Sequence, residues 1–189
     1  MHRSAVLDRL GCSYSIQSVP PDGDCFYHAF IKTHGLSLTT GELRRFVARN
    51  ITDDDAVVFG ALQNRHMKTK EVRAVISNTQ EWADDLEISV LVRSLSDVAL
   101  FIIDEDNNCV CKKGQDGARY KSTIARKSEH YYAISQADVK LSRIMSGLEY
   151  LKVDLTVTEQ PSEPTTNSRA LIVVSSLLIA LLTMRVIVT

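Results

Sequence analysis

The stretch PDGDCFYHAF, residues 21–30, decides the fold because it joins a loop of acids and glycine to an apolar run. The residues before it, YSIQSV (14–19), are β-prone and stop at two prolines, so they predict a short strand. The apolar residues after the cysteine recur with helical spacing as far as Gly35, which predicts a helix that ends there. The sequence therefore predicts a strand, a short loop and a helix, with Cys25 in the first turn of the helix.

Cys25 has the position of a candidate nucleophile. At the positive end of a helix the thiolate is favoured by about 0.3 to 1 kcal/mol. Gly23 lets the chain approach a substrate closely, and consecutive N–H groups of the loop from Asp22 to Cys25 can converge on a developing oxyanion. The alternative is a small buried thiol, which is the commoner role of a free cysteine and the one we expect for Cys12.

A thiol nucleophile needs a base, and the sequence contains five histidines. His28 follows Cys25 by three residues on the same predicted helix, where a side chain usually packs along the helix surface. His130 instead opens the β-prone segment HYYAIS after a loop, and a strand beside the start of a helix can hold an imidazole against a thiol. We therefore expect His130 to be the base; the alternative is a histidine satisfied within the core.

Helical patterns fill the first part of the chain. Residues 39–51, TTGELRRFVARNI, begin with a capping box formed by Thr39 and Glu42. The same spacing recurs at Asn78 and Glu81, which predicts the start of a second helix there.

That second helix runs through WADDLEISVLVRSLSD (82–97), with Trp82 as a core aromatic and Glu87 as a paired helix acid. Three later segments are typical of strands: VALFIID (98–104), CVCKK (109–113) and HYYAIS (130–135). Helices first and strands last predict an α/β or α+β fold in which helices flank a small β-sheet.

Composition limits the class of protein. The chain has 189 residues, of which 44% are apolar, and a formal net charge of −1, so it suits one globular domain. No run of Lys or Arg is long enough to follow a phosphate backbone, which argues against a nucleic-acid partner. The first residues contain no apolar run typical of a secretory signal, so we expect reduced thiols and a cytosolic domain.

No metal or organic cofactor is expected. Cys109 and Cys111 are separated by a single residue, which is tighter than the usual spacing of zinc ligands. The acids at 104–106 lack the downstream ligands of a calcium loop and indicate a solvated turn.

The last part of the chain differs from the rest. The segment ALIVVSSLLIALLTM (170–184) carries no charge, and the residues before it are rich in Pro, Ser and Thr. We therefore divide the chain into a domain at 1–150, a linker at 151–169 and a C-terminal hydrophobic helix at 170–189. A helix of 15 uncharged residues is short for a bilayer, so the two alternatives are a membrane anchor, which we favour, and a packed or interfacial helix.

Four blocks in this order resemble the ovarian tumour (OTU) family of cysteine proteases: PDGDCFYHAF, EWADDLEISVLVRSL, VALFIID and EHYYAI. The resemblance runs from about residue 15 to residue 135 and implies an OTU-like fold, similar to the compact OTU domains of viruses and bacteria. It implies that Cys25 is the nucleophile, His130 the general base and Asp22 the conserved acid three residues before the cysteine. Gly23 and Asp24 complete the oxyanion loop.

One position departs from the family pattern. Many members have Asp or Asn two residues after the histidine, where the side chain orients the imidazole, and this chain has Tyr132. The tyrosine hydroxyl, Asp22 or a residue from elsewhere could take that role, and a Cys–His pair without an acid would retain weaker activity.

The resemblance implies a deubiquitinase that hydrolyses isopeptide bonds at the C-terminus of ubiquitin or a ubiquitin-like modifier. The alternative is a membrane-tethered OTU-like module that binds ubiquitin and cleaves it weakly or not at all. Either protein would have ubiquitin as its partner, would need no cofactor and would be held at an intracellular membrane by residues 170–189.

Overall fold

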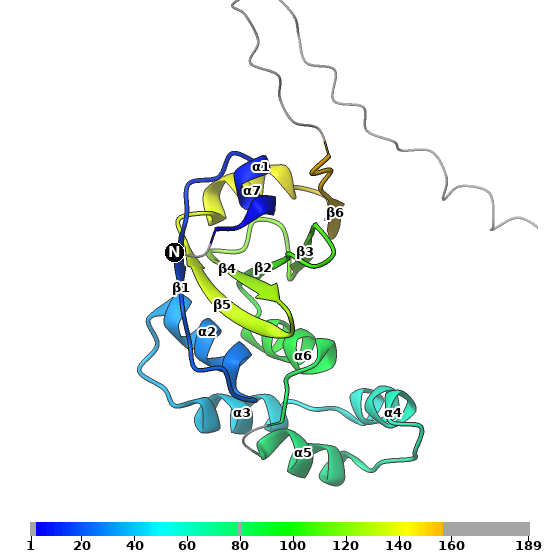
Figure 1. Ribbon diagram of the computed structural model, residues 1–189. Helices are drawn as coiled ribbons and strands as arrows, with labels where there is room; N and C mark the ends of the chain where they lie inside the picture. Colours follow the sequence, from blue (N-terminus) through cyan, green and yellow to red (C-terminus); the bar gives the residue numbers. More distant parts are fainter. Residues whose placement is uncertain (1–2, 79–80, 157–189) are drawn as a thin grey trace, which may run out of the picture. The chain divides into compact units, whose positions relative to one another are not determined.

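A computed structural model describes residues 3–78 and 81–156, and these residues form a mixed β-sheet with helices on both faces (Figure 1). The strand order within this part of the chain is β1-β5-β4-β2-β3-β6. The strands are β1 (Ser15–Gln17), β2 (Val98–Asp104), β3 (Cys109–Lys113), β4 (Tyr120–Lys127), β5 (His130–Ser135) and β6 (Tyr150–Lys152). β2 and β4 are parallel and the other pairs are antiparallel.

Seven helices lie within the described residues: α1 (Ala5–Arg9), α2 (Cys25–His34), α3 (Thr40–Arg49), α4 (Asp53–Leu62), α5 (Thr69–Ser77), α6 (Asp85–Leu95) and α7 (Asp138–Ile144). Helices α2 to α6 share one hydrophobic core with one face of the sheet. Helices α1 and α7 form a second core on the opposite face (Figure 1). The fold therefore has three layers, as the α/β prediction requires.

Strand β2 lies in the middle of the sheet, and this position explains why its sequence is continuously apolar. Leu100 and Ile102 face the core with α2 to α6, while Phe101 and Ile103 face the core with α1 and α7. A strand that is covered on both faces needs apolar residues at successive positions, because side chains alternate between the faces.

The predicted boundaries of α2 and α3 are confirmed. Gly35 ends α2 with φ at 59°, a conformation in which glycine has no Cβ penalty. Thr39 caps α3, and its side chain and that of Glu42 complete the predicted capping box.

The predicted start of the next helix is wrong. Asn78 ends α5, and α6 begins at Asp85 with Asp84 as its N-cap, whose carboxylate accepts the Glu87 N–H at 3.0 Å. Trp82 therefore precedes the helix, and 52% of it is exposed, so it is not the core aromatic that the apolar spacing predicted. Glu87 is buried and paired, as expected.

Strands β4 and β6 were not predicted from the sequence. The predicted domain boundary at residue 150 falls at the start of β6, which pairs with β3, and Val153 beyond it is buried. The folded part thus continues into the segment that was predicted as a linker.

The hydrophobic segment 170–189 lies outside the described residues. Within residues 3–78 and 81–156, no helix is long and apolar enough to cross a membrane.

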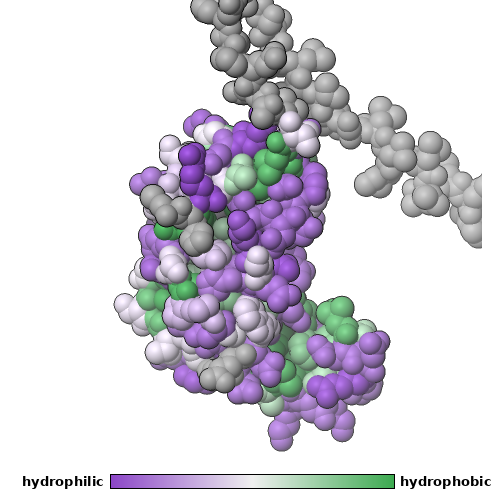
Figure 2. Space-filling view, viewed as in Figure 1, coloured by the Kyte–Doolittle hydropathy of each residue, from purple (hydrophilic) through white to green (hydrophobic). Residues whose placement is uncertain are grey.

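Helix α4 carries an apolar surface. Val57, Val58 and Leu62 are each at least half exposed, and Figure 2 shows hydrophobic side chains gathered over this helix in the lower part of the view. Ala56 and Phe59 on its other side are buried in the core, so α4 is attached to the fold through a narrow stripe.

Candidate active site

Cys25 is the first residue of α2 and is almost fully buried. Backbone groups of Phe26, in the same helix, and of Tyr131, in β5, lie near its sulfur and lower the pKa of the thiol. The rings of Phe26 and Tyr131 pack edge to face with their centroids 5.4 Å apart, which fixes the start of α2 against the start of β5.

Burial raises the pKa of the Cys25 thiol above its ordinary value. The backbone groups near the sulfur lower the pKa, as expected at the start of a helix, but the cost of desolvating a thiolate is larger. The helix start therefore favours the thiolate in direction, as expected, but does not compensate for the burial of the sulfur.

His130 begins β5, directly after the two-residue turn of the β4–β5 hairpin. Ser128 and Glu129 form this turn with φ at 49° and 65°. The imidazole forms a hydrogen bond with the backbone of Val19, and its Nδ1 is buried without a hydrogen-bond partner among the described residues. Burial lowers the pKa of His130, so the ring is a neutral proton acceptor near neutral pH.

The start of α2 packs against the start of β5, and Asp22 acts on both Cys25 and His130, so the two predicted site residues lie in one region of the fold. Tyr131, whose backbone lies near the Cys25 sulfur, is the neighbour of His130 along β5. A neutral thiol and a neutral imidazole would suit general-base catalysis, in which the imidazole takes the thiol proton as the sulfur attacks.

Asp22 lies close to both groups without bonding to the imidazole. Its negative charge raises the pKa of Cys25 and of His130, so it faces the pair from the loop. Its Oδ2 atom lies 3.5 Å from Nε2 of His28, the histidine that sequence reasoning assigned to packing.

The loop from Asp22 to Cys25 uses two of its N–H groups internally. The Asp24 N–H donates to Asp22 Oδ1 at 2.9 Å, and the Cys25 N–H donates to the Asp22 carbonyl at 3.1 Å. In this conformation these two groups are not presented to a substrate oxyanion, so the turn must open before they can bind one.

Asp24 faces the interior rather than the substrate side of the loop. Its Oδ1 lies 2.5 Å from Arg44 Nε, and its Oδ2 accepts a hydrogen bond from the Thr40 hydroxyl at 2.7 Å. The predicted oxyanion-loop residue therefore anchors the loop to α3.

Tyr132 lies on the same side of β5 as His130. The two rings pack edge to face, with centroids 4.5 Å apart and an interplanar angle of 89°. The tyrosine ring limits how the imidazole can rotate, and the hydrogen bond with Val19 holds one ring nitrogen.

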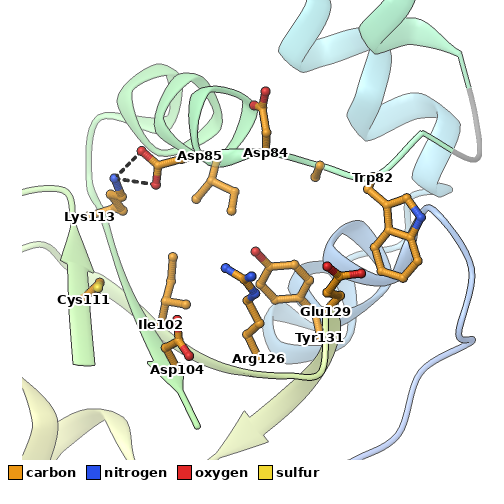
Figure 3. A pocket seen from close by; sticks show the side chains of 12 residues that line it. Trp82, Asp84, Asp85, Ile102, Asp104, Cys111, Lys113, Arg126, Glu129 and Tyr131 are labelled. Carbon is orange, nitrogen blue, oxygen red and sulfur yellow. Dashed lines mark hydrogen bonds and ion pairs between the residues drawn. The ribbon is translucent and has the colours of Figure 1, made fainter. Parts of the chain in front are cut away.

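A groove of about 520 Å³ reaches the neighbours of His130 in the chain, although neither Cys25 nor His130 lines it (Figure 3). Glu129 and Tyr131, on either side of His130 in the chain, line one part of it, and Trp82 lines another. Figure 3 shows the Tyr131 ring near the centre and Trp82 at one end, with the Asp85–Lys113 ion pair on the far side. The groove therefore runs from Trp82 to the two residues that flank His130 in the chain.

Acidic side chains outnumber basic ones along the groove. Asp84, Asp85, Asp104 and Glu129 line it together with Lys113 and Arg126. Lys113 is already paired with Asp85 at 2.8 Å, so the remaining charge is negative and favours a ligand with basic groups.

Sequence reasoning missed three contributors: Val19, Trp82 and Arg44. Val19 contacts the His130 imidazole through its backbone, so the identity of its side chain gives no sign of this role. Arg44 had a signal, because it lies three and four residues before the buried Val47 and Ala48 and so on the apolar face of α3.

Comparison with solved structures shows which known fold this chain resembles. An OTU domain in complex with ubiquitin is 18% identical, with a TM-score of 0.55 over 72% of this chain and 87% of that one. The chain has an OTU-like fold. An OTU deubiquitinase from Wolbachia pipientis wMel has a TM-score of 0.52 at 16% identity, over 69% of this chain and 96% of that one. The viral OTU protease of Dera Ghazi Khan virus has a TM-score of 0.50 at 16% identity, covering 64% and 80%.

The OTU-like fold is supported by structure alone. No protein-family model and no curated protein matches the sequence.

Proposed function

We propose that this protein is a deubiquitinating cysteine protease, which hydrolyses isopeptide bonds at the C-terminus of ubiquitin or a ubiquitin-like modifier. The observation that carries the proposal is the packing of the Phe26 ring on the Tyr131 ring, with centroids 5.4 Å apart, because it attaches the start of α2, where Cys25 lies, to the strand that begins with His130. Two solved structures with the same fold have ubiquitin bound, one of them from Wolbachia pipientis wMel.

The chemistry is acyl transfer through a thioester. His130 takes the Cys25 proton while the sulfur attacks the carbonyl of the modifier's C-terminal glycine. The tetrahedral intermediate collapses, the C–N bond breaks, and the imidazolium gives its proton to the leaving lysine amine. Water, activated by the neutral imidazole, then hydrolyses the thioester and regenerates the thiol.

The groove supplies the binding site for the modifier's tail. The tail would lie between Trp82 and the β4–β5 hairpin, with its last carbonyl at Cys25. The N–H groups of Asp24 and Cys25 would bind the oxyanion once they leave Asp22.

Incubation of the full chain with ubiquitin chains tests the proposal. Wild type should shorten the chains, and Cys25→Ala should abolish cleavage. Cys12→Ala is the matched control, because Cys12 is buried in the core with α1 and α7, on the other face of the sheet. Loss of cleavage in both variants, or in neither, would refute the assignment of Cys25.

A second candidate function is a module that binds ubiquitin and cleaves it weakly or not at all. Tyr132 favours it, since no carboxylate or amide follows His130 at that position. Retention of the wild-type chain on immobilised ubiquitin without any cleavage would select this function. A panel of probes based on ubiquitin and ubiquitin-like modifiers would identify the modifier.

We also propose that residues 170–189 hold the domain at the cytosolic face of an intracellular membrane. The support is the sequence itself, because 15 residues there carry no charge and end at an arginine whose side chain can reach the interface.

A further inference from the structure

Arg44 is the largest fully buried side chain among the described residues. It lies on α3 and does not touch the groove, yet it contacts segments on both sides of the candidate site. A buried guanidinium is costly unless its donors are used, so its partners indicate what it holds in place.

The first set of contacts reaches the loop before Cys25. Arg44 Nε lies 2.5 Å from Asp24 Oδ1, and Nη2 donates to the Gly23 carbonyl at 3.0 Å. Thr40, one turn earlier on α3, donates its hydroxyl to the other oxygen of Asp24 at 2.7 Å. The two residues that precede the nucleophile are therefore attached to α3 by side chain and by backbone.

The second set reaches the other wall of the groove. Arg44 Nη2 also donates to the carbonyl of Glu81, the residue before Trp82, and Nη1 donates to the Ile76 carbonyl at 3.3 Å near the end of α5. Trp82 itself is half exposed and lines the groove. The segment that carries it is thus held by the same guanidinium as the catalytic loop.

The remaining contacts fix the guanidinium. Its plane lies over the Tyr27 ring, with 4.4 Å between Cζ and the ring centroid, and Nη1 lies 3.6 Å from Glu87 Oε2. The Tyr27 hydroxyl donates to the same Glu87 carboxylate. Only a planar group with several donors can meet carbonyls, carboxylates and a ring face together, so lysine cannot replace it.

We propose that Arg44 is a positioning residue, which fixes the loop at Gly23–Asp24 and the segment at Glu81–Trp82 relative to each other and so sets the geometry between Cys25 and the substrate groove. The expected effect of Arg44 on catalysis rests on the proposed function. The expected effect of Arg44 on the positions of Cys25 and Trp82 rests on geometry alone.

Three readouts on the full chain test it. The alkylation rate of Cys25, followed by mass spectrometry of its peptide, reports the loop. Acrylamide quenching of Trp82, the only tryptophan in the chain, reports the groove wall. The kcat and KM for a ubiquitin substrate report catalysis.

Arg44→Lys should leave the chain folded, with alkylation of Cys25 faster by about threefold or more and with stronger quenching of Trp82. The kcat/KM value should fall by up to about 100-fold, because a displacement of 1 Å at a reacting group is enough for such a loss. A thiol that reacts faster with a small reagent and more slowly with substrate has lost its positioning, whereas a purely structural role would change neither rate at temperatures where the variant is folded.

Two further variants, Asp24→Asn and Thr40→Val, test the attachment of the Gly23–Asp24 loop separately from that of the Glu81–Trp82 segment. Both weaken the attachment of the loop and leave the Glu81 contact in place, so they should change the Cys25 rate and leave Trp82 quenching unchanged. They also keep the proposal testable if Arg44→Lys does not fold. Arg93→Lys is the matched control, because Arg93 forms a two-contact pair with Asp55 and does not line this groove.

Unchanged alkylation and quenching in a folded Arg44→Lys chain would overturn the proposal. So would the same changes in Arg93→Lys, or an unchanged Cys25 rate in both Asp24→Asn and Thr40→Val. If wild type cleaves no modifier while the alkylation and quenching results are as expected, the proposed function fails and the positioning of Cys25 and Trp82 by Arg44 stands.

Discussion

At the scale of single residues, the protonation of Cys25 and His130 determines the mechanism. Burial raises the pKa of the thiol and lowers the pKa of the imidazole, so both groups are neutral between their two pKa values. In the proposed mechanism the proton would therefore leave Cys25 only as the sulfur attacks the substrate.

The pH profile of activity follows from these directions. In the proposed mechanism the neutral imidazole is the base, so kcat/KM should fall only when pH drops below the ordinary histidine value of 6.5. Alkylation of free Cys25 by iodoacetamide should rise with an inflection at or above the ordinary thiol value of 9.0. A thiolate that is already formed at pH 6 would contradict a neutral pair.

At the scale of elements, the β4–β5 hairpin and the start of α2 are the two parts that must meet. Both can be predicted locally: Gly35 and the aromatics mark α2, and HYYAIS marks β5. The two-residue turn at Ser128 and Glu129 could not be predicted, since neither residue favours positive φ.

The turn stores backbone strain next to His130. Glu129→Gly removes the Cβ that disfavours φ at 65°, so it should stabilise the protein by about 1 kcal/mol, measured as the free energy of unfolding in urea. Glu129→Ala, which keeps the Cβ, is the matched control and should give no such gain. Equal stability of the two variants would show that the turn is not strained.

The start of α6 shows why a local motif can fail. Asn78 and Glu81 have capping spacing, yet the helix begins after Asp84. The Glu81 carbonyl accepts a hydrogen bond from Arg44, a residue on another helix, and this contact holds the segment before α6. Local sequence patterns do not predict tertiary contacts of this kind.

Arg93 of α6 forms an ion pair with Asp55 of α4, and the strength of this pair depends on pH. The hydrogen bonds from Arg93 lower the pKa of Asp55 to about 2, below its ordinary 3.8. The pair's contribution is therefore present above about pH 4 and is lost as pH falls towards 2. Arg93→Gln should lower the free energy of unfolding by roughly 1 to 2 kcal/mol at pH 7, because the half-exposed arginine is partly screened.

The same comparison near pH 2 provides the check. Wild type and Arg93→Gln should have nearly equal stability there, measured by thermal unfolding. A difference that stays constant from pH 7 to pH 2 would mean that the arginine contributes by packing and not by its charge.

At the scale of the whole molecule, the order of helices and strands was enough to predict the fold class and the layer of helices over the sheet. The residues Cys25 and His130 could be named from their local contexts, but their meeting is a property of the folded chain. Arg44 and Val19 act through contacts between distant segments, and no spacing in the sequence predicts which segments they join.

The C-terminal segment has its own test at this scale. Deletion of residues 169–189 should move the protein from the membrane fraction to the soluble fraction, since the uncharged stretch is removed. Its cleavage of ubiquitin chains should not change. An unchanged distribution between the fractions would argue against the anchor.

The most direct test of the central claim uses ubiquitin with a C-terminal electrophile. The full chain should gain the mass of one ubiquitin, with the new bond at the Cys25 sulfur. The adduct should be absent in Cys25→Ala and should form more slowly in His130→Gln. An adduct that persists in Cys25→Ala, or no adduct with the wild-type chain, would contradict the assignment of Cys25 and His130 as nucleophile and base.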